Sequence, residues 1–236
     1  MPFFVENKSI VAPGDLLAEG EYRAGDGVLR YNSKFFAMYV GLVEVRGTTI
    51  SVVPLRGSYI PQVGDIIIGK VIDYTLTTWK VDINSPYIAT LSVDQAINKK
   101  FDITRDSLTN YYNIGDALIA KIIAFSRVEP PIISTRDKGL GKLRGGMLTR
   151  IHPTRVPRLI GRKGSMINMI KNETGCKIRI GQNGIIWIYG KSPELEYIVV
   201  KAIRKIEREA HTSGLTDRVR ELIRKEKEAL RGGSNE

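Results

Sequence analysis

The chain has 236 residues, of which 42% are hydrophobic and 26% are charged, and this balance is typical of a globular protein rather than a disordered one. It contains no apolar stretch long enough to span a bilayer and no secretory signal at its start. The single cysteine, Cys176, excludes an intrachain disulfide and disfavours a zinc cluster, so we expect a cytoplasmic protein.

The net charge of +11 is concentrated in one part of the chain. Residues 138–180 carry eleven Lys and Arg residues against one acid, Glu173, and so hold +10 of that total. A basic field confined to 43 residues indicates a polyanionic partner, whereas charge that only kept the protein soluble would be spread out. A basic face without a specific ligand remains the alternative.

The first half of the chain predicts two β-rich modules. Residues 1–62 alternate short Val-, Ile-, Tyr- and Phe-rich runs with Gly, Pro and Asp, which predicts a small antiparallel β-domain. Residues 63–140 give about five β-runs with one longer polar insert, the count expected of a five-stranded barrel. The segment GKLRGG, residues 141–146, reads as a linker.

The pattern changes after residue 147. Apolar residues at helical spacing predict a short helix that ends at Gly161 and a second helix that follows Gly164. Strands at 177–180 and 185–189 flank Gln182-Asn183-Gly184, in which Asn-Gly is a strong hairpin signal.

A long helix follows Ser192, and residues 217–231 predict a final, mostly solvated helix. The expected fold is therefore multidomain β + α/β, with a β-α-α-β-β-α order and a C-terminal helix over residues 144–236.

The stretch LIGRKGSMINMI places two glycines around Arg162 and Lys163. A P-loop would need a longer loop with Lys-Ser/Thr after its last glycine, and a dinucleotide fingerprint would need Gly-x-Gly-x-x-Gly after a strand. Neither is present. A Gly-x-x-Gly between two helices can instead clamp a sugar-phosphate chain beside an apolar groove.

The span VPRLIGRKGSMINMIKNETGCKIRI resembles the core of a type I K-homology (KH) domain. This resemblance implies that bases lie across a groove that includes Ile160, Ile167, Ile178 and Ile180. The RNA-binding residues that it implies are Arg158, Ile160, Gly161, Arg162, Lys163, Gly164, Lys171, Lys177 and Arg179.

The barrel segment resembles an S1-type RNA-binding domain, a variant of the OB-fold, through VGDIIIGKVID, WKVDI and YNIGDALIAKI. Trp79 is either a stacking platform for a base or a core aromatic, and core packing is the more common role of a single strand aromatic. Further basic residues could line an RNA path: Lys99, Lys100, Lys121 and Arg127.

Taken in order, the domains resemble the S1/KH-type RNA-binding cap subunit of the archaeal RNA exosome. Gly181-Gln182-Asn183-Gly184 resembles a Gly-x-Asn-Gly element of these caps, which implies that Gly181, Asn183 and Gly184 pack against the barrel. The plainer interpretation of these residues, a type I′ hairpin, is compatible with this role. The predicted divisions are a β-domain (1–62), a barrel (63–140), a KH domain (144–212) and a helix with a tail (213–236).

The resemblance implies three copies on an RNase PH-like hexameric ring, with the β-domain docked on the ring and single-stranded RNA 3′ ends passed to it. We find no catalytic set, metal site or cofactor motif. His152 and His211 lack metal-ligand spacing, and the barrel aspartates do not cluster. A non-enzyme is therefore expected. The alternative function is a transcription elongation or antitermination factor with S1-type and KH domains.

Overall fold

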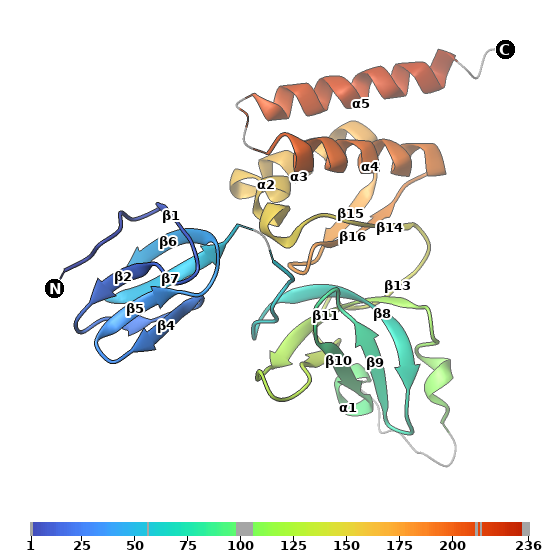
Figure 1. Cartoon of the computed structure of the whole chain (residues 1–236). Coiled ribbons are helices and arrows are strands. Elements are labelled where there is room, and N and C mark those ends of the chain that lie inside the picture. Colours follow the sequence, from blue (N-terminus) through green and yellow to red (C-terminus); the bar gives the residue numbers. More distant parts are fainter. Residues whose placement is uncertain (1, 56, 98–105, 211, 213, 233–236) are drawn as a thin grey trace. The chain divides into compact units, whose positions relative to one another are not determined.

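The protein is represented by a computed structural model that describes residues 2–55, 57–97, 106–210, 212 and 214–232 (Figure 1). The chain divides into two compact units, residues 1–57 and 58–236. The division lies five residues before the boundary predicted from the sequence. The reason is that Tyr59 is buried in the core of the barrel, where its hydroxyl donates a hydrogen bond to the Asp65 carboxylate.

The first unit consists of two small sheets. One has the order β1-β6-β7-β3 and the other the order β2-β5-β4. The strands are β1 (Ile10–Val11), β2 (Leu16–Glu19), β3 (Arg23–Ala24), β4 (Val28–Tyr31), β5 (Lys34–Ala37), β6 (Gly41–Arg46) and β7 (Thr49–Pro54). Alternate residues such as Val43, Ile50 and Val52 are buried between the sheets around Phe35. This unit is the expected small β-domain.

The second unit begins with a closed five-stranded barrel of OB-fold type. The strands β8 (Ile66–Tyr74), β9 (Thr78–Asp82), β10 (Ile88–Ser92) and β11 (Ala117–Ala124) are joined by β12 (Ile132–Ser134), which pairs with both β10 and β11 and closes the barrel. A short helix, α1 (Val93–Ala96), and a 3₁₀ turn (Leu108–Asn110) lie in the connection between β10 and β11.

Trp79 is fully buried in the barrel core, which confirms the core interpretation over the stacking one. Its indole Nε1 donates to the backbone oxygen of Tyr112 at 3.1 Å, and the two rings meet edge to face. The predicted linker 141–146 is in part a strand, because β13 (Gly141–Leu143) pairs with the first half of β11.

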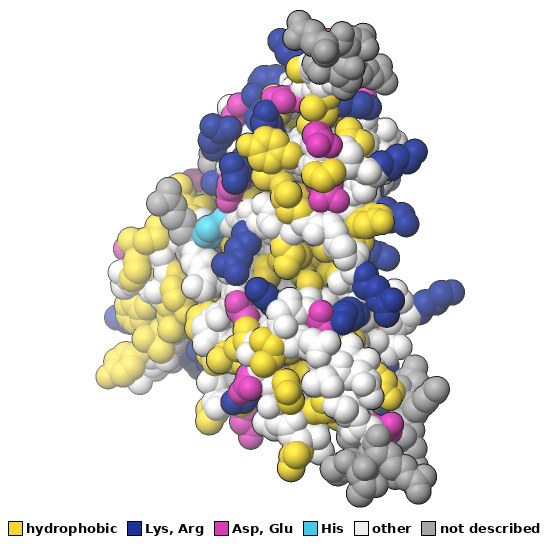
Figure 2. Space-filling model, turned by 90° about the vertical axis from the view of Figure 1, so that its right-hand side faces the viewer, with side chains coloured by type: hydrophobic (Ala, Val, Ile, Leu, Met, Phe, Trp, Pro, Cys, Tyr) yellow, Lys and Arg dark blue, Asp and Glu magenta, His cyan; other side chains and the backbone are white. Residues whose placement is uncertain are grey.

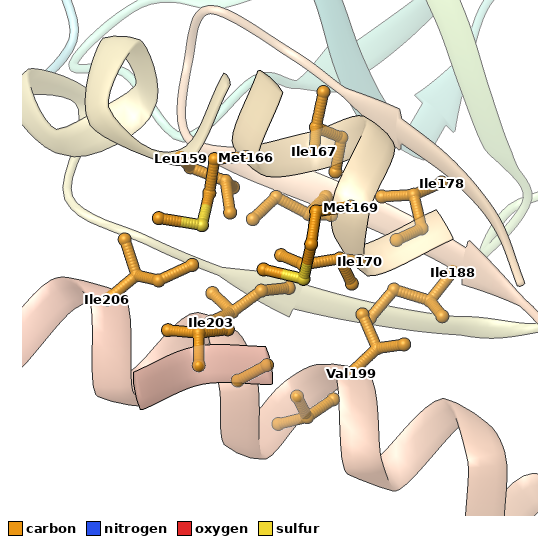
Figure 3. Close-up of a cluster of buried hydrophobic side chains, with 14 of the residues drawn as sticks. Leu159, Met166, Ile167, Met169, Ile170, Ile178, Ile188, Val199, Ile203 and Ile206 are labelled. Atoms are coloured by element: carbon orange, nitrogen blue, oxygen red, sulfur yellow. The ribbon is translucent and has the colours of Figure 1, made fainter. Parts of the chain in front are cut away.

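The KH domain has the expected β-α-α-β-β-α order. Its sheet has the order β14-β16-β15, formed by Met147–Arg150, Ile185–Tyr189 and Lys177–Ile180 respectively. A 3₁₀ turn (Pro153–Arg155), α2 (Val156–Ile160), a second 3₁₀ turn (Arg162–Gly164), α3 (Ser165–Thr174) and α4 (Pro193–Arg208) complete the domain. Side chains from α2, α3 and α4 meet Ile178 and Ile188 of the sheet in one apolar core (Figure 3).

The last helix, α5 (Leu215–Gly232), is less solvated than its sequence suggested. Leu215, Val219 and Ile223 are buried at 0–1% exposure, and the helix packs on α3 and α4. The spacing of these residues is helical, but the charged residues between them conceal the apolar stripe in the sequence. No helix in the described part of the chain combines the length and the apolar composition that a membrane span needs.

Candidate nucleic-acid interface

The basic loop lies between α2 and α3 as a tight turn with unusual backbone angles. Gly161 has φ 75° and ψ 173°, and Gly164 has φ 79°. Lys163, between them, is also in the left-handed region at φ 51°. A Cβ atom on Gly161 would lie 2.9 Å from the backbone nitrogen of Met166, so only glycine fits there without a shift of α3. The two glycines thus bring α2 and α3 together and project Arg162 and Lys163 outward.

The cations of this loop point toward solvent. Arg162 and Lys163 are both exposed, and neither forms an ion pair with a described residue. Arg158, on the last turn of α2, is held nearby because its guanidinium donates to the backbone oxygen of Thr212 at 3.0 Å. Figure 2 shows one face of the molecule, with Lys and Arg side chains over the KH domain and its junction with the barrel below. Unpaired, outward-facing cations of this kind suit phosphate contact.

The apolar residues expected to form a groove have different exposures. Ile160 is 37% exposed and is available to a ligand, whereas Ile167 and Ile178 are at 7% and 4% and belong mainly to the core. Ile180 is partly buried and packs against that core. Of the four predicted groove residues, Ile160 is therefore the one that offers substantial surface beside the glycine loop.

Three other predicted contact residues gather elsewhere. Lys171 of α3 and Lys177 and Arg179 of β15 line a cavity of about 460 Å³ between the KH domain and the barrel segment 139–143. The glycine-loop residues are not part of its lining. The predicted RNA-binding set thus divides into two groups, one at the turn between the helices and one around this cavity.

The second glycine loop, Gly181–Gly184, contacts the barrel. The Asn183 side chain is fully buried, and its amide donates to the backbone oxygens of Ile68 and Ile83 at 2.7 Å each and accepts from the Ile68 N–H at 3.3 Å. Gln182 extends this contact, since it exchanges hydrogen bonds with the Ile66 backbone at 2.6 and 2.9 Å.

The loop is not a type I′ hairpin. That turn needs positive φ at both central residues, whereas of Asn183 and Gly184 only Gly184 has one, at 81°. Added Cβ atoms would lie 2.2 Å from the Ile151 backbone oxygen at Gly184 and 2.7 Å from the Ile68 nitrogen at Gly181. Gly181 therefore permits the close approach to the barrel backbone, and Gly184 permits a close approach to the KH segment that follows β14.

Helix α5 neutralises the one acid of the basic segment. The Glu173 carboxylate lies 3.7 Å from Arg220 and 3.3 Å from Arg224, and the Glu173 backbone oxygen accepts from Lys227 at 2.6 Å. No sequence signal indicated this arrangement, because the partners are about fifty residues away. The eleven basic groups of residues 138–180 are therefore left without an acid of their own.

The barrel candidates give less support to an RNA path. The Lys121 ammonium pairs with the Asp137 carboxylate at 3.3 Å, while Arg127 is exposed. Lys99 and Lys100 lie outside the described residues.

The cysteine and the histidine that the structure describes are buried or hydrogen-bonded in ways that do not favour catalysis. Burial raises the pKa of the Cys176 thiol, which makes a reactive thiolate less available. His152 pairs through Nδ1 with the Thr154 hydroxyl at 2.8 Å, and its backbone N–H donates to Glu207. His211 lies outside the described residues. Among the residues that are described, no three His, Cys, Asp or Glu side chains come close enough to hold a metal ion.

Comparisons with known proteins agree for all three domains. Family models match for the exosome RNA-binding protein RRP4 N-terminal domain at residues 8–56, the RRP4 S1 domain at 58–124 and the KH domain at 148–209. A crystal structure described as an exosome complex RNA-binding protein superposes with a TM-score of 0.70 at 38% identity, covering 74% of this chain and 99% of that one.

Two curated relatives carry the name exosome complex component Rrp4. The protein from Thermococcus kodakarensis is 47% identical over 223 residues, covering 93% of this chain and 86% of the relative. The protein from Pyrococcus horikoshii is 46% identical over 222 residues, covering 93% and 84%. With three matching domains in the same order and this identity over nearly its full length, the chain belongs to the Rrp4 family of exosome components.

Proposed function

We propose that the chain is a non-catalytic RNA-binding subunit of the exosome that caps a nuclease ring and recruits single-stranded RNA 3′ ends for 3′-to-5′ degradation. The observation that carries this proposal is the pairing of an open basic loop with a KH domain that is fixed to an S1 barrel. Arg162 and Lys163 face solvent, while Asn183 joins the two RNA-binding folds. An RNA strand can thus contact both folds at a set separation.

In this proposal the chain contributes to RNA degradation by capturing the RNA strand and positioning it. Phosphate contacts fix the register of a strand without reading its sequence, which suits a subunit that must accept many RNAs. Bond cleavage then belongs to the ring subunits, which we propose to be an RNase PH-like hexamer that carries three copies of this chain. No cofactor is required for such a role.

The first unit offers a surface for docking on that ring. Several large apolar side chains of residues 1–57 are 46–68% exposed, which is typical of surfaces that bind other proteins. They are Phe4, Ile10, Leu29, Tyr31, Val40 and Val53. We propose that this unit supplies the contact with the ring.

Co-purification tests the assignment. The tagged chain should retain a multi-subunit nuclease ring, and the ring with the chain bound should degrade a single-stranded RNA faster than the ring alone at limiting RNA. A matched variant, Tyr31→Ser with Leu29→Ser, should lose the ring and keep RNA binding. A stable free monomer that retains RNA polymerase instead would overturn the proposal and favour a transcription factor.

A further inference from the structure

The face of the KH sheet opposite the helices carries a stacked aromatic pair, and Trp187 of this pair also packs against a small apolar cluster that includes Ile68 and Ile119 of the barrel. The rings of Trp187 and Tyr189 lie 5.8 Å apart between centroids with only 9° between their planes. The two residues are separated by one position on β16 and so point to the same side, while Ile186 and Ile188 enter the core. Tyr189 is 44% exposed, and Trp187 is held by a hydrogen bond from Nε1 to the Gly145 backbone oxygen at 2.7 Å.

Two cations stand beside these rings. In the antiparallel register of β15 and β16, Lys177 is opposite Tyr189 and Arg179 is opposite Trp187. Directly opposed residues lie on the same face with Cβ atoms about 5 Å apart. Both basic side chains are exposed, and neither forms an ion pair with a described residue. This sheet face therefore combines the exposed ring of Tyr189 with unpaired positive charge.

The cavity of about 460 Å³ continues from this face toward the barrel. Trp187, Lys177 and Arg179 line one side, Lys171 reaches it from α3, and Lys142 contributes from β13. No Asp or Glu is among its lining residues. Lys142 is paired with Asp116: partial burial alone would raise the pKa of that carboxyl, but the hydrogen bonds from Lys142 and from the Asn113 backbone lower it. The other three cations remain available to an anion.

We propose that the Trp187–Tyr189 pair and this cavity form a second RNA-binding site, separate from the glycine loop. A base of single-stranded RNA stacks on Tyr189, and the neighbouring phosphates lie against Lys177 and Arg179. Stacking on aromatic rings beside backbone-neutralising cations binds single strands without sequence preference. The inference rests on the proposed function, because it assumes that the chain binds RNA, and it adds a second surface for the same strand.

Three variants of the full-length chain separate stacking from packing, with binding to a fluorescent single-stranded RNA as the readout. Tyr189→Leu should weaken RNA binding about tenfold, within the range for loss of one base stack. Tyr189→Phe should restore it. The matched control is Tyr197→Leu, which removes a ring 50% exposed on α4 and should leave affinity within about twofold. Equal affinity of Tyr189→Leu and wild type, or equal weakening by Tyr189→Phe, would overturn the site.

If Tyr189→Leu also lowers the melting temperature, its weaker RNA binding could reflect lost stability. A variant that changes only the charge of the site avoids this problem. Lys177→Gln with Arg179→Gln changes only exposed side chains, and it should flatten the slope of log affinity against log salt by about 1.4. Arg204→Gln with Arg208→Gln on α4 removes the same charge from another exposed surface and should leave the slope unchanged.

Photocrosslinking distinguishes this inference from the proposed function. RNA that carries 5-iodouridine should crosslink to Trp187 or Tyr189 in the wild-type chain. Crosslinks confined to residues 158–165 would overturn the second site and leave the glycine loop as the RNA contact. A wild-type chain that binds no RNA, alone or in the assembled complex, would overturn both.

Discussion

Two glycine-framed loops leave the same KH core and have opposite environments. Gly161–Gly164 holds two cations in solvent, whereas Gly181–Gly184 places an amide in the fully buried contact with the barrel. In both loops the glycines remove steric barriers: Gly161, Gly164 and Gly184 adopt positive φ, and Gly161, Gly181 and Gly184 allow close approach to neighbouring backbone. The two loops differ in the side chains that lie between their glycines. Arg and Lys are too costly to bury unpaired, while an Asn amide can satisfy two carbonyls and one N–H at once.

The largest expected effect comes from making the buried loop charged. Asn183→Asp would place a carboxylate against the backbone oxygens of Ile68 and Ile83, with no donor in place of the lost amide. We expect the free energy of unfolding to fall by about 3–5 kcal/mol, the cost of an uncompensated buried charge. Urea denaturation measures it. A loss below about 1 kcal/mol would show that Asn183 does not hold the junction.

The glycines of the two loops should also differ in their tolerance of alanine. Gly184→Ala forces a Cβ to 2.2 Å from a backbone oxygen in addition to its positive φ, so we expect a loss of about 3 kcal/mol. Gly164→Ala meets only the flexible Asn168 side chain at 3.3 Å, so the backbone penalty of about 1 kcal/mol should dominate. Thermal unfolding of both variants provides the comparison, and the reverse order would contradict it.

The smallest effect should follow from removing the acid of the basic segment. Glu173→Gln loses ion pairs with Arg220 and Arg224, whose side chains are 38% and 63% exposed, so stability should fall by only about 0.5–1 kcal/mol. RNA affinity should change less than about twofold, because α5 already neutralises this carboxylate. A large gain in affinity would mean that Glu173 repels RNA in the native protein, and filter binding can detect it.

The sequence was sufficient for the domain order and for the helices around Gly161 and Gly164, because these depend on local spacing. It favoured the burial of Trp79 without excluding the stacking role, because core packing is only the more common role of such a residue. It was insufficient where distant segments meet. The β13 strand depends on pairing with β11, and the apolar stripe of α5 is interrupted by charges that pair with α3 and α4. The Trp187–Tyr189 pair had a signal, since the period-two pattern of 185–189 puts both rings on one face, but only the register with β15 shows the cations beside them.

Residue types alone also could not separate the predicted RNA-binding set into two groups. Lys171, Lys177 and Arg179 follow the glycine loop closely in sequence, yet they line the cavity at the barrel. The two groups are separated because the chain runs from the α2–α3 turn through α3 to β15, which lies beside the barrel segment. This separation depends on the tertiary structure and not on local sequence.

The most direct test of the account is the salt dependence of RNA binding when the open loop is reversed in charge. In the assembled complex, Arg162→Asp with Lys163→Asp should weaken binding at least about tenfold and flatten the log–log salt slope by about 1.4, because two phosphate contacts are lost. The free energy of unfolding should stay within about 0.5 kcal/mol of wild type, since both side chains face solvent. Unchanged affinity and unchanged slope would contradict the claim that this loop holds the RNA backbone.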